Sequence, residues 1–273
     1  MRIIRFIDGS EQLRYGRPLD GDRAELLENP LSGDPRPTGE VAEVARLLAP
    51  VQPSNIICIG KNYAAHAHES GSDTPEHPIL FMKPTGALAD PGQPIRIPAA
   101  CDHGPEVDYE CELAVVLGPR PVCDVPADRA LEFVLGYTVA NDVSARRWQQ
   151  HGGGGQWVRG KSFDTFCPLG PALLTRDEVP DPQSLPLWTD LNGRRMQDGH
   201  TADMIFPVAD LIAFISRDTT LPPLTVILTG TPSGVGFARK PPVFLHPGDT
   251  VTVAVEPIGQ LTNPVEAAPG PAP

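Results

Sequence analysis

Short apolar runs, separated by proline, glycine and polar residues, make up most of this chain. Such runs, bounded by turn residues and rich in β-branched side chains, predict buried strands. The predicted strands lie at residues 1–7, 56–60, 79–84, 107–117, 226–232, 242–245 and 248–259. A hairpin is predicted around Asn192 and Gly193, because an Asn-Gly dipeptide favours the tight turn that joins two antiparallel strands.

Helical patterns are fewer and shorter than the strand patterns. Residues 62–70 have helix-forming composition, residues 126–135 indicate a short helix, and residues 208–217 form an amphipathic helix. Residues 137–150 begin as a strand and continue as a loop or short helix. The chain lacks the regular alternation of strand and helix that builds a Rossmann sheet. These patterns predict an α+β fold with a β-rich core.

Proline positions and composition divide the chain into three parts. Residues 1–50 are predicted to form a small N-terminal domain, because Pro50 and Pro53 separate them from the next buried strand. This domain begins with a strand, continues through a polar, turn-rich stretch and ends with a helical or strand-like piece. Residues 51–265 form the main domain, and residues 266–273 are a frayed, disordered tail.

The composition narrows the class of protein. The formal net charge of −12 argues against nucleic acid or an anionic membrane as a partner, and an anionic ligand needs a local positive site. No apolar segment approaches the ~20 residues of a membrane span, and the N-terminus lacks a signal-peptide pattern. Five cysteines without a CxxC pair favour reduced thiols. We therefore expect a cytoplasmic protein that binds neither nucleic acid nor membrane.

Carboxylates alternate with apolar residues in the stretch VDYECELAVVL at residues 107–117. In a β-strand, Asp108, Glu110 and Glu112 share one face. The apolar run that follows takes this strand into the core, where unpaired carboxylates are costly. A hard divalent cation, Mg²⁺ or Mn²⁺, resolves this conflict, since both prefer carboxylate oxygens. The alternative is a solvated strand face.

Two further groups carry candidate chemistry. Asp142 ends an apolar strand, and helical spacing from it would bring Arg146 and Gln149 onto neighbouring turns; alternatively Asp142 caps a helix and Arg146 is a surface residue. His66 and Glu69, at i and i+3, meet on one helical turn, where the carboxylate orients the imidazole for proton transfer. The alternative is a pair on a helix surface.

Two weaker signals have ordinary interpretations. Lys83 follows a strand and either points toward the site or faces solvent, as a lone lysine in that position usually does. The glycine-rich stretch 151–155 is a flexible turn or a mobile flap.

Four separated motifs resemble one known family. In order, VDYECELAVVLG, GYTVANDVSARRWQ, GKSFDTFCPLGPAL and VILTGTPSGVG look like the fumarylacetoacetate hydrolase family, and their wording is most like its subgroup called fumarylacetoacetate hydrolase domain-containing protein 2. The resemblance covers about residues 51–262. It implies a mixed β-roll of the family's C-terminal type, assembled as a homodimer.

The resemblance also implies roles for individual residues. The metal ligands are Glu110, Glu112 and Asp142, with Asp108 a neighbour; the catalytic residues are His66, Glu69 and Lys161, the first two on a lid; and the substrate-binding residues are Arg146, Gln149 and Thr231. The sequence departs from the family at Ala65 and Arg147, where family members commonly carry aspartate. These departures put lid behaviour and substrate choice in doubt, and they remove no ligand.

The function implied is that of a Mg²⁺- or Mn²⁺-dependent enzyme acting on a small anionic 2-oxo acid or 1,3-dicarbonyl acid. The first expectation is acylpyruvate-type hydrolysis of a C–C bond through a metal-stabilised enolate. The alternative is a keto–enol tautomerase, isomerase or decarboxylase acting on oxaloacetate or a related 2-oxo diacid. A third possibility, of another class, is a non-catalytic module that binds metal or ligand.

Overall fold

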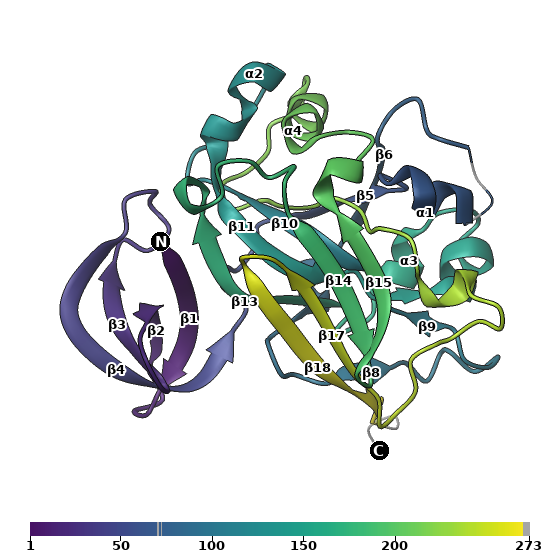
Figure 1. Cartoon of the computed structure of the whole chain (residues 1–273), viewed down its shortest axis with the longest axis horizontal. Coiled ribbons are helices and arrows are strands. Elements are labelled where there is room, and N and C mark those ends of the chain that lie inside the picture. The colour runs from purple at the N-terminus through teal and green to yellow at the C-terminus, as the bar shows by residue number, and fades with distance from the viewer. Residues whose placement is uncertain (70, 72, 270–273) are drawn as a thin grey trace.

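Strand pairing organises the protein into a long sheet, a five-stranded sheet and a two-stranded ribbon (Figure 1). The computed structural model describes residues 1–69, 71 and 73–269. Within these residues the long sheet has eleven strands, and parallel pairs such as β16–β5 occur beside antiparallel pairs such as β10–β11. The predicted β-rich, mixed α+β fold is confirmed.

The elements have the following bounds. In pairing order the long sheet consists of β2 (Leu13–Pro18), β3 (Arg23–Glu28), β4 (Arg36–Leu48), β1 (Arg2–Asp8), β13 (Cys167–Thr175), β11 (Val134–Asn141), β10 (Cys111–Leu117), β16 (Val226–Leu228), β5 (Ile56–Gly60) and β6 (Ile79–Lys83), with β7 (Leu88–Ala89) beside β13. The five-stranded sheet consists of β15 (Arg194–His200), β14 (Pro186–Leu191), β17 (Thr250–Val255), β18 (Gly259–Ala267) and β8 (Ile95–Ile97). The ribbon pairs β9 (Val107–Asp108) with β12 (Ser144–Ala145).

Helices are short and lie around the sheets (Figure 1). The α-helices are α1 (Ala64–Glu69), α2 (Ala127–Ala130), α3 (Val158–Lys161) and α4 (Val208–Ser216), and Trp148–Gly152 form a π-helical turn. Turns of 3₁₀-helix lie at Thr85–Ala87, Leu131–Phe133, Arg176–Glu178, Thr201–Asp203 and Gly236–Ala238. None of the helices in the described residues is long and apolar enough to cross a membrane.

Strand β10 is buried on both faces, which explains its unbroken apolar run. Leu113 and Val115 belong to the core cluster shared with Val253 of the five-stranded sheet, whereas Ala114 and Val116 belong to the cluster on the opposite face. A strand covered on both sides has no solvent face on which to place polar residues. Glu112 lies at the start of this strand and Glu110 directly precedes it, because the strand predicted at 107–117 is interrupted at residues 109–110, between β9 and β10.

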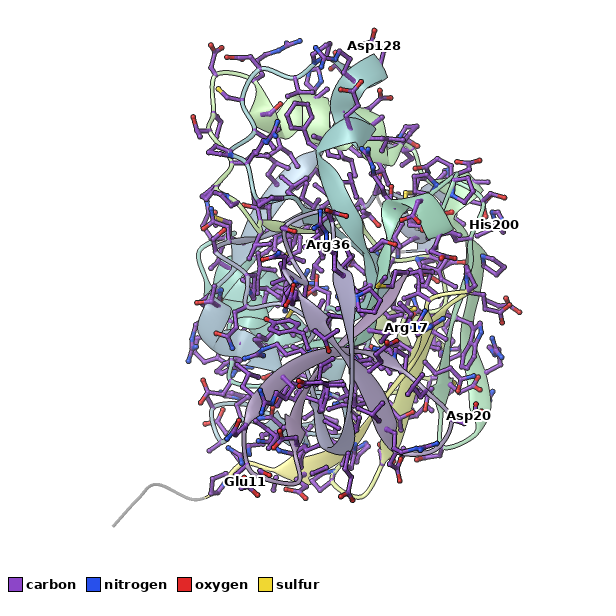
Figure 2. All side chains as sticks on the ribbon, turned by 90° about the vertical axis from the view of Figure 1, so that its left-hand side faces the viewer. Glu11, Arg17, Asp20, Arg36, Asp128 and His200 are labelled. Atoms are coloured by element: carbon purple, nitrogen blue, oxygen red, sulfur yellow. The ribbon has the colours of Figure 1, made fainter. Side chains whose placement is uncertain are left out.

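The first fifty residues form a lobe that shares a strand with the rest of the chain. At its start β1 pairs with β13, where Ile3 lies opposite Leu173, and further along it pairs with β2 and β4. Figure 2 looks onto this lobe, with the exposed Arg17 and Arg36 labelled. Two strands of the lobe, β2 and β3, lie in the stretch that sequence analysis described only as polar and turn-rich.

Several predicted elements agree with the structure. The hairpin of β14 and β15 turns at Asn192 and Gly193, which both have positive φ, as the predicted tight turn requires. Helix α4 lies within the predicted residues 208–217, and α1 lies within 62–70, of which residue 70 is outside the described residues.

Other predicted elements are wrong or wrongly bounded. The helix predicted at 126–135 ends early, because Val134 and the residues after it pair with β10. Residues 242–245 form no strand, since proline removes ladder donors there and Leu245 makes a single backbone bond to Val107. The predicted tail starts too early, because β18 continues to Ala267 beside β8. Residues 270–273 of that tail lie outside the described residues.

Candidate active site

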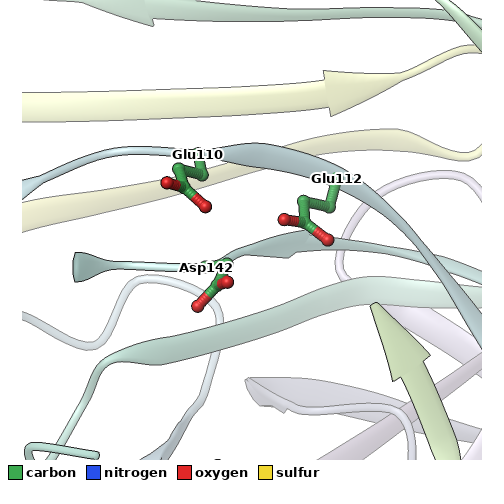
Figure 3. Close-up of side chains that lie close together, drawn as sticks. All are labelled: Glu110, Glu112 and Asp142. Carbon is green, nitrogen blue, oxygen red and sulfur yellow. The ribbon is translucent and has the colours of Figure 1, made fainter. Parts of the chain in front are cut away.

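Antiparallel pairing of β10 and β11 brings the three predicted carboxylates together. The backbone N–H of Asp142 donates to the carbonyl of Glu110 at 2.9 Å, and Glu112 lies opposite Ala140 across the two strands. Single oxygens of Glu110, Glu112 and Asp142 all lie within 4.8 Å of one another, and all three residues are buried. Figure 3 shows the side chains pointing into one space. The predicted convergence of these residues is thus present.

Two buried lysines hold the cluster together. Lys161 Nζ, at the end of α3, lies 2.8 Å from Glu110 Oε2 and 2.7 Å from Asp142 Oδ2. Lys83 Nζ, at the end of β6, lies 2.6 Å from Asp142 Oδ1 and donates to the carbonyl oxygens of Val143 and Lys161. Both lysines are 1% exposed, so the solvent-facing interpretation of Lys83 is wrong.

Arg146 contacts two of the acidic residues, Asp108 and Glu110, and also Gln149. Its Nε and Nη2 each lie 2.8 Å from Asp108 Oδ2, and its Nη1 lies 2.6 Å from Glu110 Oε1 and 3.0 Å from Gln149 Oε1. The ring of Phe237 covers the guanidinium at 4.3 Å. The backbone between Asp142 and Arg146 is extended in β12, so the helical spacing proposed from Asp142 is wrong, whereas Arg146 and Gln149 do meet on one helical turn.

The electrostatics separate the two glutamates. Burial opposes ionisation of Glu110, but the charges of Lys161 and Arg146 prevail and hold its pKa below the ordinary range. Burial raises the pKa of Glu112, and the neighbouring charges of Asp142 and Glu110 raise it further. Glu112 accepts one backbone hydrogen bond, from the N–H of Gly230 at 2.7 Å.

The charge of the cluster fits a divalent cation. The cluster sets four buried carboxylates against three buried cations in the described residues; the cations form ion pairs with three of the carboxylates, and ionised Glu112 leaves one negative charge over. The carboxylates are Asp108, Glu110, Glu112 and Asp142, and the cations are Lys83, Arg146 and Lys161. A dication among three carboxylate oxygens would relieve the repulsion that disfavours ionised Glu112. Hard oxygen donors of this kind suit Mg²⁺ or Mn²⁺.

The predicted histidine–glutamate pair lies on α1. His66 Nδ1 is 2.9 Å from Glu69 Oε1, and His66 is 7% exposed. Both oxygens of Glu69 also accept the N–H of Gly234, at 3.0 and 2.9 Å. The carboxylate is therefore fixed between the helix and a second segment, and the imidazole takes its orientation from it.

One loop, residues 230–236, donates backbone N–H groups to three different carboxylates. Each donor is a glycine of the stretch GTPSGVG, and the bonds measure 2.7 to 3.0 Å. The pairs are Gly230 with Glu112, Gly234 with Glu69, and Gly236 with Asp108. We call residues 230–236 the amide loop. It connects the acidic cluster, the helix α1 and the partner of Arg146.

Thr231 lies within the amide loop, and its hydroxyl group is already engaged. It donates to the carbonyl of Cys111 at 2.8 Å and accepts from Gln197 Nε2 at 2.8 Å. Gln197 in turn accepts from the N–H of Cys111 and from Thr189. In this geometry the hydroxyl proton points at the protein backbone rather than at a substrate carboxylate.

A cavity of about 410 Å³ collects the predicted residues, a size within the rough 300–1,000 Å³ range of small-molecule sites. Its lining includes His66, Glu110, Glu112, Arg146, Gln149, Lys161 and Thr231. Glu69 and Asp142 are not among the lining residues but contact two of them, His66 and Lys161. Sequence analysis missed the lining residues Lys61, Phe81, Trp157 and Phe237. Among these, Phe81 is buried between the exposed Leu80 and Met82 on β6, but all three are apolar, so the sequence gives no local signal for it.

The two departures from the family pattern lie apart from the cluster. Ala65 is exposed on α1. The backbone N–H of Arg147 donates to Glu106, and its guanidinium lies 5.3 Å from the ring of Trp148. Neither residue is among those that line the cavity.

Fold and site define the class of protein. Residues 55–266 match the family model described as fumarylacetoacetate hydrolase C-terminal, and residues 1–50 match one described as Rv2993c-like, N-terminal. The chain belongs to the fumarylacetoacetate hydrolase family of enzymes, which confirms the resemblance drawn from its four motifs.

Individual relatives carry names from both predicted chemistries. The chain is 48% identical to "Oxaloacetate tautomerase fahd2, mitochondrial" of Xenopus laevis, over 80% of this chain and 68% of that protein. It resembles the crystal structure of 5-carboxymethyl-2-hydroxymuconate delta-isomerase from Mycobacterium smegmatis, with 42% identity, a TM-score of 0.84 and coverage of 98% and 100% of the two chains. It also resembles a fumarylacetoacetate hydrolase from Exiguobacterium antarcticum, with 35% identity, a TM-score of 0.82 and coverage of 98% and 99%.

Proposed function

We propose that this protein is a divalent-metal-dependent keto–enol tautomerase of small anionic 2-oxo acids, with oxaloacetate as the first substrate to test. The observation that carries the proposal is the shared cavity, in which an oriented imidazole and a cluster of carboxylates and ammonium groups face the same space. A named oxaloacetate tautomerase at 48% identity supports it. Tautomerase activity thus replaces hydrolysis as the leading hypothesis.

The residues of the site have separate roles in the proposed proton transfer. When bound by Glu110, Glu112 and Asp142, Mg²⁺ or Mn²⁺ would supply a Lewis acid that acidifies the carbon beside a keto group. Lys161 places positive charge where the enolate oxygen develops. Because Glu69 holds Nδ1 of His66, Nε2 becomes the atom that exchanges a proton with this carbon.

Arg146 and Gln149 act on the substrate side of the cluster in this proposal. Arg146 is held by Asp108 and Glu110, so it contributes fixed positive charge. Burial opposes a charged Arg146, yet Asp108 and Glu110 raise its pKa; burial likewise opposes a charged Lys161, and Asp142 and Glu110 raise its pKa. Arg146 and Lys161 are therefore both charged at neutral pH.

Hydrolysis of a C–C bond is the second candidate function. It is favoured by the likeness to a solved fumarylacetoacetate hydrolase and by the same dyad, which can activate a water molecule instead of a carbon acid. Hydrolysis additionally needs an ordered water and an acylpyruvate-type substrate. The products distinguish the two functions, because tautomerisation gives one isomerised acid whereas hydrolysis gives two fragments.

The test follows the ultraviolet absorbance of oxaloacetate enol with Mg²⁺ and then with EDTA, and it identifies products from an acylpyruvate in parallel. We expect metal-dependent loss of the enol signal without cleavage. His66→Ala should slow turnover about 10²- to 10⁴-fold, the usual contribution of general acid–base catalysis, while the exposed control His246→Ala should not.

Three results would contradict the proposal. Cleavage of the acylpyruvate, without tautomerisation of oxaloacetate, would favour the hydrolase. Metal binding without turnover of either compound would favour the non-catalytic module. Normal turnover by His66→Ala would remove the dyad from the mechanism. The homodimer and the cytoplasmic location stay predictions, and light scattering after gel filtration tests the first.

A further inference from the structure

Lys61 is the charged residue in the described lining of the cavity that the proposed mechanism does not use. It follows β5 directly, and its backbone has a φ of +55°, in the left-handed region. For a residue with a side chain this conformation costs about 1–2 kcal/mol. Backbone outliers of this kind cluster at functional sites.

The backbone around Lys61 is anchored on both sides. Before it, Gly60 packs so tightly under Trp157 that an added Cβ would lie 2.3 Å from the indole ring. After it, the buried side chain of Asn62 donates to the carbonyls of Phe206 and Thr229 and accepts the N–H of Phe206. The position from which the Lys61 side chain enters the cavity is therefore fixed.

A chain of contacts through two aromatic rings of the cavity lining connects Lys61 with the acidic cluster. Lys161 Nζ lies 5.0 Å from the centre of the Phe81 ring, which meets Trp157 edge to face at 5.6 Å. The Trp157 ring in turn lies 5.8 Å from Lys61 Nζ. The cavity thus has one ammonium group at the cluster, beside Phe81, and a second one beside Trp157.

The two ammonium groups have different surroundings. Lys161 is held between Glu110 and Asp142 and is buried, whereas Lys61 is half-buried and reaches the cavity along the ring of Trp157. In a protein with a net charge of −12, a cation at a cavity attracts an anionic ligand group. A 2-oxo diacid carries two such groups, its oxo-acid head and a distal carboxylate.

We infer that Lys61 binds the distal carboxylate of a 2-oxo diacid whose oxo-acid head lies at the acidic cluster. Lys61 then determines specificity for diacids over monoacids and takes no part in the proton transfer. This inference rests on the proposed function, since it assumes that the oxo-acid head binds at the cluster.

The test compares oxaloacetate with its 4-methyl ester, which keeps the carbon skeleton and lacks the distal charge. For Lys61→Met, which leaves the side-chain length and the backbone conformation nearly unchanged, the KM for oxaloacetate should rise about 10- to 100-fold, as expected on losing a charge-assisted hydrogen bond. The kcat for oxaloacetate should change by less than about threefold, as for loss of uniform binding, and the KM for the ester should stay constant. Lys61→Arg should restore most of the preference, and Lys240→Met, at an exposed lysine outside the cavity, is the control.

An unchanged KM for oxaloacetate, or an equal rise for both compounds, would overturn the inference. Binding of both compounds, followed by intrinsic tryptophan fluorescence with Mg²⁺ present, separates this result from failure of the proposed function. Binding of the diacid that depends on Lys61, in a protein without tautomerase activity, would sustain the inference and reject the tautomerase. Turnover of oxaloacetate that is indifferent to Lys61 would do the reverse.

Discussion

Ionisation of Glu112 is unfavourable in the absence of a bound cation. Glu112 is 1% exposed, and its pKa is raised by burial and by the charges of Asp142 and Glu110. Its partner Glu110, only two residues away, has a lowered pKa because Lys161 and Arg146 contact it. Two glutamates on one strand face thus have opposite tendencies, set by which of them the cations reach.

We expect Glu112→Gln to separate folding from metal binding. A carboxyl group whose pKa is raised on folding binds more protons in the native state, so metal-free stability falls as pH rises from the ordinary carboxyl range through the raised pKa. Glutamine removes this loss, and each unit of raised pKa corresponds to about 1.4 kcal/mol. Urea unfolding in EDTA at pH 8 should show the variant at least as stable as the wild type.

Mg²⁺ should stabilise the wild type and leave Glu112→Gln unchanged, since one carboxylate ligand is gone. The exposed Glu40→Gln is the control and should respond to Mg²⁺ as the wild type does. A variant that is less stable than the wild type in EDTA, or that gains equally from Mg²⁺, contradicts this account of Glu112.

At the residue scale, charges that share a strand face could be predicted from the sequence. Charges contributed by segments distant along the chain could not. Glu110 and Glu112 could be paired by the period of a strand, and the apolar run beside them indicated burial. Lys83 could be read two ways because nothing local shows that β6 runs past the cluster, and its contact with Asp142 spans 59 positions along the chain. Lys83 shares a strand face with Phe81, but Leu80 and Met82 on the other face are equally apolar, so the sequence does not show which face is buried.

At the scale of elements, the amide loop positions the site through its backbone, because its N–H groups hold three carboxylates. Gly234 has a φ of +102°, and an added Cβ would lie 2.3 Å from the carbonyl oxygen of Met196. A substitution there must move the N–H that holds Glu69. His66 would then lose the orientation that the proposed proton transfer needs.

We expect Gly234→Ala to lower the kcat for oxaloacetate by about 10- to 100-fold, on the scale reported for small misplacements of catalytic groups. Gly248→Ala is a matched control, because Gly248 has a φ of +96° and open space around its Cα. Both variants carry the cost of a left-handed alanine, about 1–2 kcal/mol. Equal kinetics in the two would show that the effect is backbone strain alone.

Elements with a strong local signal were predicted well, and those defined by distant partners were not. The β14–β15 hairpin and α4 follow from their own residues, through turn chemistry and amphipathic spacing. Residues 126–135 have helical composition, yet their last two residues join β11 because β10 lies beside them. Strand pairing of this kind depends on neighbours that sequence spacing does not identify.

At the scale of the whole molecule, β1 ties the N-terminal lobe to the main sheet. Ile3 is fully buried and belongs to the core cluster that includes Leu173 and Ile56. A lobe that supplies a core residue to its neighbour is not expected to unfold on its own. The boundary predicted near residue 50 agrees with the limits of the two family models, and we predict from the shared core that the lobe does not unfold independently.

Ile3→Ala should destabilise the entire chain by about 2–5 kcal/mol, the usual cost of truncating a buried isoleucine. We expect one thermal transition, shifted as a whole, when circular dichroism and tryptophan fluorescence are compared. Val41→Ala on β4, where the side chain is 53% exposed, is the control and should change little. A second transition that moves alone would show that the lobe unfolds independently.

The amide loop limits how this protein can vary. Its glycine donors stand four and two positions apart and serve three separate carboxylates. Inserting or deleting a single amino acid between these glycines would move every later N–H donor away from its carboxylate acceptor. Substitution of the intervening residues is therefore the remaining way to change the amide loop while keeping its three hydrogen bonds. These residues are Thr231, Pro232, Ser233 and Val235.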